Sequence, residues 1–207
     1  MGKIMTVGVT GASGAVLART TLRLLEADER VSRIHLVVTA AGQRLLAQEL
    51  GINASDAKQL PASLSGTRAM KTELLSNQDI GASIASGSYP VDAMIVIPCS
   101  AGTLASIANG LSDDLLARAG DVCLKERRNL LLCVRETPLN RVHLQNMLRA
   151  QEAGAAIMPV VPAFYYAPQS IDELVEQFVC RALAQIGLPQ EHQYRWEGNP
   201  RSKAREA

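Results

Sequence analysis

Five short apolar runs, separated by longer segments of helical periodicity, constrain this sequence more than any other feature. The runs are continuously hydrophobic, as in AMIVIP and NLLLCV, and do not alternate with polar residues. Strands that are apolar on both faces are typical of parallel sheets covered by helices on both sides. The expected strands are Ile4–Thr10, Ile34–Thr39, Ala93–Pro98, Asn129–Val134 and Ala156–Val161.

The segments between these runs have the periodicity of amphipathic helices. The alternation predicts an α/β fold with a doubly wound parallel sheet, Rossmann-like or flavodoxin-like, whose ligands bind beyond the carboxyl ends of the strands. Residues 53–83 give mixed signals, and no element is predicted there. The expected helices are Ser13–Asp28, Ala40–Leu50, Ser100–Ala119 with a break near Gly110, Asn140–Ala153 and Ser170–Ile186.

Length and composition favour a single domain. A chain of 207 residues, 47% of them hydrophobic, can bury a core of its own. We expect this domain to span residues 1–194 and to be followed by a polar tail, 195–207. The net charge of +1 argues against nucleic acid or a membrane surface as a partner. The sequence shows no leader-like segment, and prolines break its most apolar stretch, so we expect a cytoplasmic protein with no membrane span.

The cysteines indicate reduced thiols. Cys99, Cys123, Cys133 and Cys180 show no C-x-x-C spacing, so neither a disulfide framework nor a zinc site is expected. Cys99 follows a predicted strand and could be a nucleophile. No histidine lies near it in the sequence, which favours a packed and inert thiol.

A glycine-rich turn follows the first predicted strand. In Thr10–Gly14 (TGASG), the glycines permit a tight turn, and the helix that follows offers N–H groups to a phosphate. Ser13 could both cap this helix and bind the phosphate. The alternative is a tight turn with a good cap and no ligand. The turn is not a P-loop, because no Gly-Lys-Ser/Thr follows it.

A second turn of this kind, Cys99–Thr103 (CSAGT), follows the strand Ala93–Pro98. Two such turns at one edge of a sheet could hold a nucleotide between them. For Ser100 or Thr103 taken alone, helix capping is the favoured explanation.

Two charged residues, Arg135 and Glu136, directly follow the predicted strand Asn129–Val134. Arg135 suits phosphate or carbonyl groups, because its guanidinium presents paired donors. Glu136, if partly desolvated, could have a raised pKa and transfer protons near neutral pH. The alternative for this dipeptide is a surface ion pair.

Two more charges lie on helix faces that otherwise read as apolar. Arg181 follows Phe178 and Leu174 on one stripe, and Glu49 follows Leu45 on another. Buried charges cost several kcal/mol unless they are paired. Arg181 therefore predicts a ligand phosphate nearby, and Glu49 predicts a basic group or a subunit interface. The alternative is that each side chain reaches water at the edge of its stripe.

Three further segments are less specific. The loop Ala85–Pro90 (ASGSYP) could fold over a ligand or could be an ordinary connection. The aromatic cluster Phe164–Tyr166 could stabilise a carbocation or could be core packing. The basic run Lys125–Arg128 (KERR) is interpreted as a solvated turn.

Taken together, these segments resemble the UbiX flavin prenyltransferases, a family that also includes one component of the phenolic acid decarboxylases. The resemblance covers nearly the whole chain except residues 53–83, and it is specific because the motifs share both order and spacing. The matching segments are Thr10–Gly14 (TGASG), Ala85–Ser88 (ASGS), Ile97–Ala105 (IPCSAGTLA), Ala117–Arg128 (ARAGDVCLKERR), Val134–Leu148 (VRETPLNRVHLQNML) and Met158–Val175 (MPVVPAFYYAPQSIDELV).

The resemblance implies a flavoprotein in which FMN lies against both turns and the neighbouring strand ends. Its expected FMN-binding residues are Gly11, Ala12, Ser13, Thr39, Ser100, Ala101, Gly102, Thr103 and Arg135, with Arg118 contributing. The phosphate of dimethylallyl monophosphate is expected at Ser86, Lys125, Tyr165 and Arg181. Glu136 is expected to transfer protons, with Glu49 contributing, from the same or a neighbouring subunit.

The implied reaction is metal-independent. Lys125, Arg181 and Arg135 would take up charge from the departing phosphate, near the ring of Tyr165. The dimethylallyl group would join N5 and C6 of reduced FMN, and the prenylated FMN would pass to a UbiD-like decarboxylase. The family also implies a large homo-oligomer, which we expect to be a dodecamer.

Three other functions fit parts of the sequence. A flavin-dependent cysteine decarboxylase shares the fold, but typically has Asn where Gly102 lies and an active-site His on the preceding helix. A short-chain dehydrogenase would need Tyr-x-x-x-Lys, which no tyrosine here begins. A non-catalytic flavin carrier for a decarboxylase would retain FMN without turnover.

Overall fold

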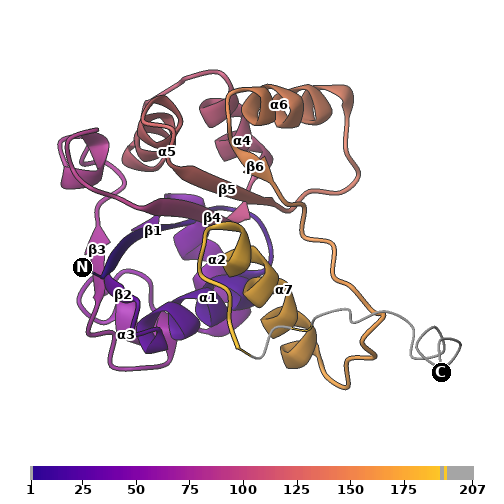
Figure 1. The fold of residues 1–207 in the computed structure, drawn as a ribbon. Coiled ribbons are helices and arrows are strands. Elements are labelled where there is room, and N and C mark those ends of the chain that lie inside the picture. The colour runs from indigo at the N-terminus through magenta and orange to yellow at the C-terminus, as the bar shows by residue number, and fades with distance from the viewer. Residues whose placement is uncertain (1, 192–193, 195–207) are drawn as a thin grey trace, which may run out of the picture.

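The computed structural model describes residues 2–191 and 194, so the predicted tail 195–207 lies outside the described residues. Its centre is a parallel sheet with the strand order β3-β2-β1-β4-β5-β6 (Figure 1). In this doubly wound order, strands are added to one side of β1 up to β3 and to its other side from β4 onward, so the predicted fold is confirmed. The strands are β1 Lys3–Val9, β2 Val31–Val38, β3 Thr72–Leu75, β4 Ala93–Cys99, β5 Asn129–Val134 and β6 Ala156–Ile157.

Helices cover both faces of this sheet (Figure 1). One face is covered by α1 Ala15–Ala27, α2 Ala40–Leu50, α3 Leu60–Ser65 and α7 Ile171–Gln185. The other face is covered by α4 Ala101–Ala108, α5 Leu115–Lys125 and α6 Arg141–Glu152, with the short 3₁₀ helix η1 Ser83–Ala85 packed on α5.

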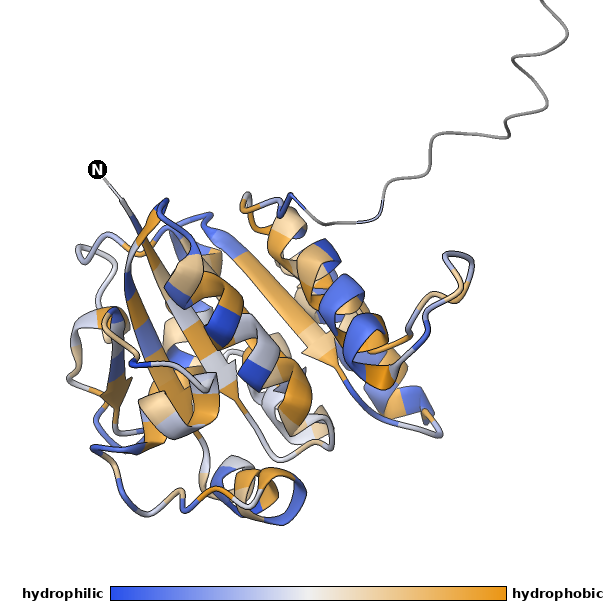
Figure 2. Cartoon of the chain, turned by 90° about the horizontal axis from the view of Figure 1, so that it is seen from below, coloured by the Kyte–Doolittle hydropathy of each residue, from blue (hydrophilic) through white to orange (hydrophobic). Residues whose placement is uncertain are grey.

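The two helical layers explain why the strands are apolar without alternation. In β4, Ile95 and Ile97 belong to the core on the α1 side, whereas Met94 and Val96 belong to the core on the α5 side. All four side chains are fully buried. Figure 2 shows the same arrangement, with hydrophobic residues along the strands and on helix surfaces that face them.

The structure differs from the sequence-based prediction at four places. Strand β3 and helix α3 lie within residues 53–83, where no element was predicted, because both are short and lack a long apolar run. The break predicted near Gly110, which has a φ of 66°, is confirmed by the separation of α4 from α5, but α5 continues beyond the predicted end at Ala119 to Lys125. Finally, β6 ends at Ile157 and not at Val161, although Met158 N–H and Val160 N–H still donate to Leu132 O and Val134 O at 3.0 and 2.8 Å.

Helix α2 packs closely against β1, and Gly42 makes this approach possible. A Cβ atom at Gly42 would lie 2.7 Å from the backbone oxygen of Val9, well inside van der Waals contact. The close approach holds the start of α2 beside the carboxyl end of β1, where the first predicted turn begins.

We predict that Gly42→Ala lowers the free energy of unfolding by about 1–3 kcal/mol, because backbone atoms must shift to admit the methyl group. Urea denaturation followed by circular dichroism measures the change. Gln43→Ala, at the exposed neighbouring position on the same helix, is the control and should stay within about 0.5 kcal/mol of the parent. Equal stability of the two variants would contradict the close-packing explanation.

Candidate functional site

Thr10 joins the two predicted turns. Its side chain Oγ1 donates to Pro98 O at 2.9 Å and accepts from Ser100 N–H at 2.7 Å. Thr10 is 1% exposed, so these bonds lie in the protein interior. The carboxyl ends of β1 and β4 are therefore tied together at the point where the strand order reverses, which is where ligands bind in folds of this type. The sequence places Thr10 at the start of the TGASG motif, but it predicts no role for this side chain.

The N-terminus of α1 is occupied by a carboxylate from α2. Glu49 accepts from Gly14 N–H at 3.0 Å and from Ala15 N–H at 2.7 Å. Glu49 is therefore paired, but with backbone donors and not with the basic group that the sequence predicted. The expectation of free N–H groups at this helix start is wrong for Gly14 and Ala15. The expectation that Ser13 caps α1 is also wrong: the cap position is Gly14, with a φ of 116° and no side-chain capping bond.

The surroundings of Glu49 favour its charged form. Burial raises the pKa of its carboxyl group, but hydrogen bonds from Ala15, Gly14 and Ser13 and the positive charge of Arg135 together hold the pKa below its usual value of 4.5. Glu49 is thus a fixed negative charge near neutral pH. Its electrostatic coupling to Arg135 also places the end of β5 near the first turn.

The N-terminus of α4 is capped in a different way. Ser100 Oγ accepts from Thr103 N–H and donates to Thr103 Oγ1 at 3.1 Å, which confirms the capping explanation for Ser100. The N–H groups of Ala101 and Gly102 lie in the first turn, where no intrahelical acceptor exists. These donors and the two hydroxyl groups form a suitable site for the phosphate of a nucleotide.

Other predicted FMN-binding residues surround the same edge. Thr39 caps α2 by accepting from Gly42 N–H at 3.0 Å, and Thr39 N–H donates to Val9 O. Gly11 packs against α2 so closely that a Cβ atom there would lie 2.5 Å from the Cβ of Ala41. Ala12, the next residue of the first turn, is buried. The structure therefore brings together the carboxyl ends of β1, β2 and β4, as predicted.

Arg135 and Glu136 extend this group from the end of β5. Arg135 N–H donates to Cys99 O at 3.0 Å, which continues the pairing of β5 with β4. Both side chains are half-buried. The ion pairs among the described residues do not include one between Arg135 and Glu136, so the predicted alternative of a surface ion pair is not observed. Arg135, Ser13 and Gly14 line a cavity of about 260 Å³.

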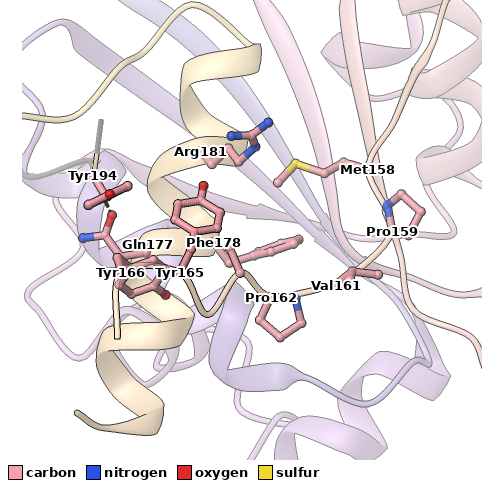
Figure 3. Close-up of a pocket in the computed structure, with 11 residues that line it drawn as sticks. Met158, Pro159, Val161, Pro162, Tyr165, Tyr166, Gln177, Phe178, Arg181 and Tyr194 are labelled. Atoms are coloured by element: carbon pink, nitrogen blue, oxygen red, sulfur yellow. Dashed lines mark hydrogen bonds between the residues drawn. The ribbon is translucent and has the colours of Figure 1, made fainter. Parts of the chain in front are cut away.

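A second cavity, of about 390 Å³, lies between α7 and the chain that follows β6 (Figure 3). Arg181 and Phe178 line it from α7, and Tyr165 lines it from the loop before this helix. Phe178 and Pro162 line both this cavity and the one beside Ser13 and Arg135. The two cavities therefore adjoin at Phe178 and Pro162, whereas Tyr165 and Arg181 line only the second of the two.

Arg181 is exposed in the single chain, so the prediction that it lies on the buried stripe of α7 is wrong. The buried stripe runs through Val175, Val179, Ala182 and Leu183. Arg181 flanks that stripe, on the side that faces the cavity. The charge thus avoids burial in the core and remains available to a ligand.

Ser86 and Lys125 lie elsewhere in the chain. Lys125 ends α5 immediately before β5, whereas Glu136 follows the other end of β5. The six residues of β5 span about 20 Å. The structure therefore does not bring Lys125 to Glu136 within one chain, contrary to the prediction of one shared site. Arg118 belongs with the Ser86 group, because its Nε donates to Ala85 O at 3.2 Å.

The cysteines are buried and unsuited to nucleophilic chemistry. Burial raises the pKa of Cys99 and of Cys123 to about 12 and that of Cys180 to about 11. All four cysteines are free thiols. The interpretation of Cys99 as a packed, inert thiol is confirmed. Residues 2–191 and 194 contain no cluster of three or more His, Cys, Asp or Glu side chains that could hold a metal ion. None of the helices in this part of the chain is long and apolar enough to cross a membrane.

Known proteins that are similar to this chain are flavoproteins. The Flavoprotein family model matches residues 2–183, so this chain is a flavoprotein. The flavin prenyltransferase UbiX of Escherichia coli K12 is 44% identical over 198 residues, which cover 95% of this chain and 99% of that relative. The chain belongs to the UbiX flavin prenyltransferase family.

Two solved structures agree with this assignment. A crystal structure of AnUbiX in complex with FMN and dimethylallyl pyrophosphate is 39% identical, has a TM-score of 0.85, and covers 96% of this chain and 100% of its own. A dodecameric FMN-dependent UbiX-like decarboxylase from Escherichia coli O157:H7 is 40% identical, with a TM-score of 0.84 and coverage of 94% and 100%.

We predict that Glu49→Gln lowers the free energy of unfolding by about 1 kcal/mol at pH 7, because the N-terminus of α1 loses its fixed negative charge. Since the pKa of Glu49 is lowered in the folded state, this stabilisation is fully present above the unfolded value of 4.5 and is lost as the pH falls through the folded value. Urea denaturation between pH 7 and pH 3 should show the difference from the parent shrinking with acidity. The exposed Glu29→Gln is the control, and a pH-independent difference would argue against the charge.

Proposed function

We propose that this chain is a metal-independent flavin prenyltransferase, which transfers the dimethylallyl group of dimethylallyl monophosphate to N5 and C6 of reduced FMN. The observation that carries the proposal is the junction of two cavities. One cavity lies beside Ser13 and Arg135 at the strand ends, and the other holds Arg181 and Tyr165. The proposed flavin site and the proposed site of the prenyl donor would therefore adjoin at Phe178 and Pro162.

FMN would be held at the carboxyl edge of the sheet, where it would supply the nucleophilic N5 and C6 atoms. The first turn of α4, with Ser100, Ala101, Gly102 and Thr103, is the better site for its phosphate, because Glu49 already accepts from the start of α1. Gly11, Ala12, Ser13 and Thr39 would line the rest of the flavin site, together with Arg135.

Arg181 and Arg135 would bind the phosphate of the prenyl donor. As the allylic C–O bond breaks, negative charge grows on the departing phosphate and positive charge on the dimethylallyl carbon. Fixed guanidinium groups stabilise the first charge, and the face of Tyr165 can stabilise the second. Fixed cations of this kind can stabilise a phosphate leaving group, as a metal ion does in other enzymes.

Glu136 would take up the proton that leaves flavin C6 when the second bond to the dimethylallyl group, the carbon–carbon bond at C6, forms. It is half-buried at the end of β5 and accepts from Thr137 N–H at 3.1 Å, which directs its carboxylate at the strand end. Glu49 would contribute a fixed negative charge at the first turn, which attracts the guanidinium of Arg135.

Ser86 and Lys125 would complete the phosphate site from a second copy of the chain, with Arg118 beside them. Within one chain they lie at the amino edge of the sheet, so only an assembly could bring them to Arg181. A homo-dodecamer is the proposed assembly, and the dodecameric relative supports it. The proposed recipient of prenylated FMN is a UbiD-like decarboxylase, and the buried free thiols support a cytoplasmic location.

Anaerobic incubation with FMN, dithionite and dimethylallyl monophosphate tests the proposal. The expected result is a flavin whose mass has increased by one C5H8 unit. Dimethylallyl diphosphate should be tested in parallel, because that donor is bound in the AnUbiX structure. Loss of CO2 from a cysteine-containing peptide would instead indicate a cysteine decarboxylase. Retention of unmodified FMN would indicate a carrier.

We predict that Glu136→Gln slows formation of the prenylated flavin by about 10²–10⁴-fold, which is the usual contribution of a positioned acid or base. Single-turnover kinetics with mass detection of the flavin measures the effect. Glu152→Gln, on an exposed part of α6, is the control. A Glu136→Gln enzyme with the parent rate would remove this residue from the proton transfer.

We also predict that Arg181→Ala raises the KM for the prenyl donor by about 10–100-fold, as expected when a charged hydrogen bond to phosphate is lost. FMN affinity, measured by fluorescence titration, should remain within about twofold, because the nucleotide site lies at the strand ends. Arg141→Ala on α6 provides a control for the loss of one charge. An unchanged KM in Arg181→Ala would return this residue to a structural role.

A further inference from the structure

The Ser86 loop, defined here as residues Ser86–Tyr89, is held by a guanidinium that the sequence suggested would lie in a solvated turn. Arg128 donates through Nη2 to Gly87 O at 2.6 Å and through Nη1 to Tyr89 O at 2.8 Å. Its side chain is half-buried, whereas the preceding residue Arg127 is exposed. A guanidinium is planar and rigid, so two bonds from it fix the relative positions of two carbonyl groups.

A second contact ties the same loop to the sheet. His35, in β2, is 1% exposed, and its Nε2 lies 2.8 Å from the hydroxyl oxygen of Tyr89. The two rings pack edge to face, with centroids 5.4 Å apart. On its other side, His35 Nδ1 lies 3.5 Å from a carboxylate oxygen of Glu73 in β3. The Ser86 loop is thus held from the sheet below and from the start of β5 beside it.

Lys125 packs against the same loop together with Glu126. A Cβ atom at Gly87 would overlap the carboxylate of Glu126 and lie 2.6 Å from Lys125 Nζ, so the Lys125–Glu126 ion pair packs directly on the backbone of the loop. Ser86 Oγ lies 2.9 Å from Ser88 Oγ at the exposed side of this loop. A shift of the loop by even an ångström would therefore change the spacing between the ammonium group and the serine hydroxyl.

We propose that Arg128 is a positioning residue for the phosphate of the prenyl donor. Its two bonds to the carbonyls of Gly87 and Tyr89 hold the Ser86 loop, and with it Ser86 Oγ, in a fixed position beside Lys125, whose Nζ pairs with Glu126 in the single chain. The inference rests on the proposed function, which assigns Ser86 and Lys125 to that phosphate. The Tyr89–His35 contact supports the same loop conformation from inside the protein.

The test compares three variants with the parent enzyme. Arg128→Met removes both the charge and the two bonds. Arg128→Lys keeps the charge, but a single ammonium group cannot reproduce the paired geometry at both carbonyls. Arg127→Met removes one charge at the neighbouring exposed position and leaves both loop bonds intact. KM and kcat for dimethylallyl monophosphate, FMN affinity and oligomeric state are measured for each.

We predict that Arg128→Met and Arg128→Lys each raise the KM by about tenfold or more, which corresponds to loss of one charge-assisted hydrogen bond. We expect kcat and FMN affinity to stay within about threefold, and Arg127→Met to resemble the parent. Hydrogen–deuterium exchange should be faster in the Ser86 loop of Arg128→Lys and unchanged in α4. Tyr89→Phe, which removes the hydrogen bond with His35 but keeps the ring, should also raise the KM and loop exchange, and it carries the test if Arg128→Met does not fold.

A parent-like KM and parent-like loop exchange in Arg128→Lys would overturn the inference, because charge alone would then suffice. Equal KM increases in Arg127→Met and Arg128→Met would overturn it as well. If the parent enzyme itself forms no prenylated flavin, the proposed function fails instead, while the exchange measurement still reports whether Arg128 holds the loop.

Discussion

The two hydrogen bonds of the Thr10 hydroxyl hold the ligand-binding edge together. One group both donates to Pro98 O and accepts from Ser100 N–H, so the ends of β1 and β4 cannot separate without breaking both bonds in the interior. Buried hydrogen bonds of this kind are costly to leave unmade. The first turn, the start of α4 and the cavity beside Arg135 all take their positions from this junction.

At the same edge, the N-termini of α1 and α4 differ in which groups accept hydrogen bonds from their first N–H groups. Both termini attract negative charge. At α1 the charge is supplied by Glu49, whereas at α4 the hydroxyl of Ser100 leaves backbone donors of the first turn without an intrahelical acceptor. Only α4 is therefore suited to a nucleotide phosphate. The glycine-rich motif at α1, which looks like the stronger phosphate signal in the sequence, holds a carboxylate.

The positive charges are distributed between the two edges of the sheet. Arg135 lies at the carboxyl edge, Arg181 lies on α7 beside the chain that follows β6, and Lys125 lies at the amino edge, against the Ser86 loop that Arg128 holds. The fold allows no other arrangement, because α5 runs antiparallel to the strands and must end where β5 begins. The residues proposed for the donor phosphate therefore lie on different sides of one chain, which is the geometry expected of a protein whose copies complete one another.

The sequence alone determined the fold class, the continuously apolar strands and the gathering of Thr39, Ser100 and Arg135 at one edge, since all three follow from local periodicity and from the geometry of parallel sheets. It also carried the family resemblance, because order and spacing of motifs are properties of the chain. Only the tertiary structure decided that Glu49 occupies the start of α1, that Arg181 avoids the core, and that Lys125 lies away from Glu136. These outcomes depend on which distant elements pack together and on the direction of each helix, and no local pattern encodes them.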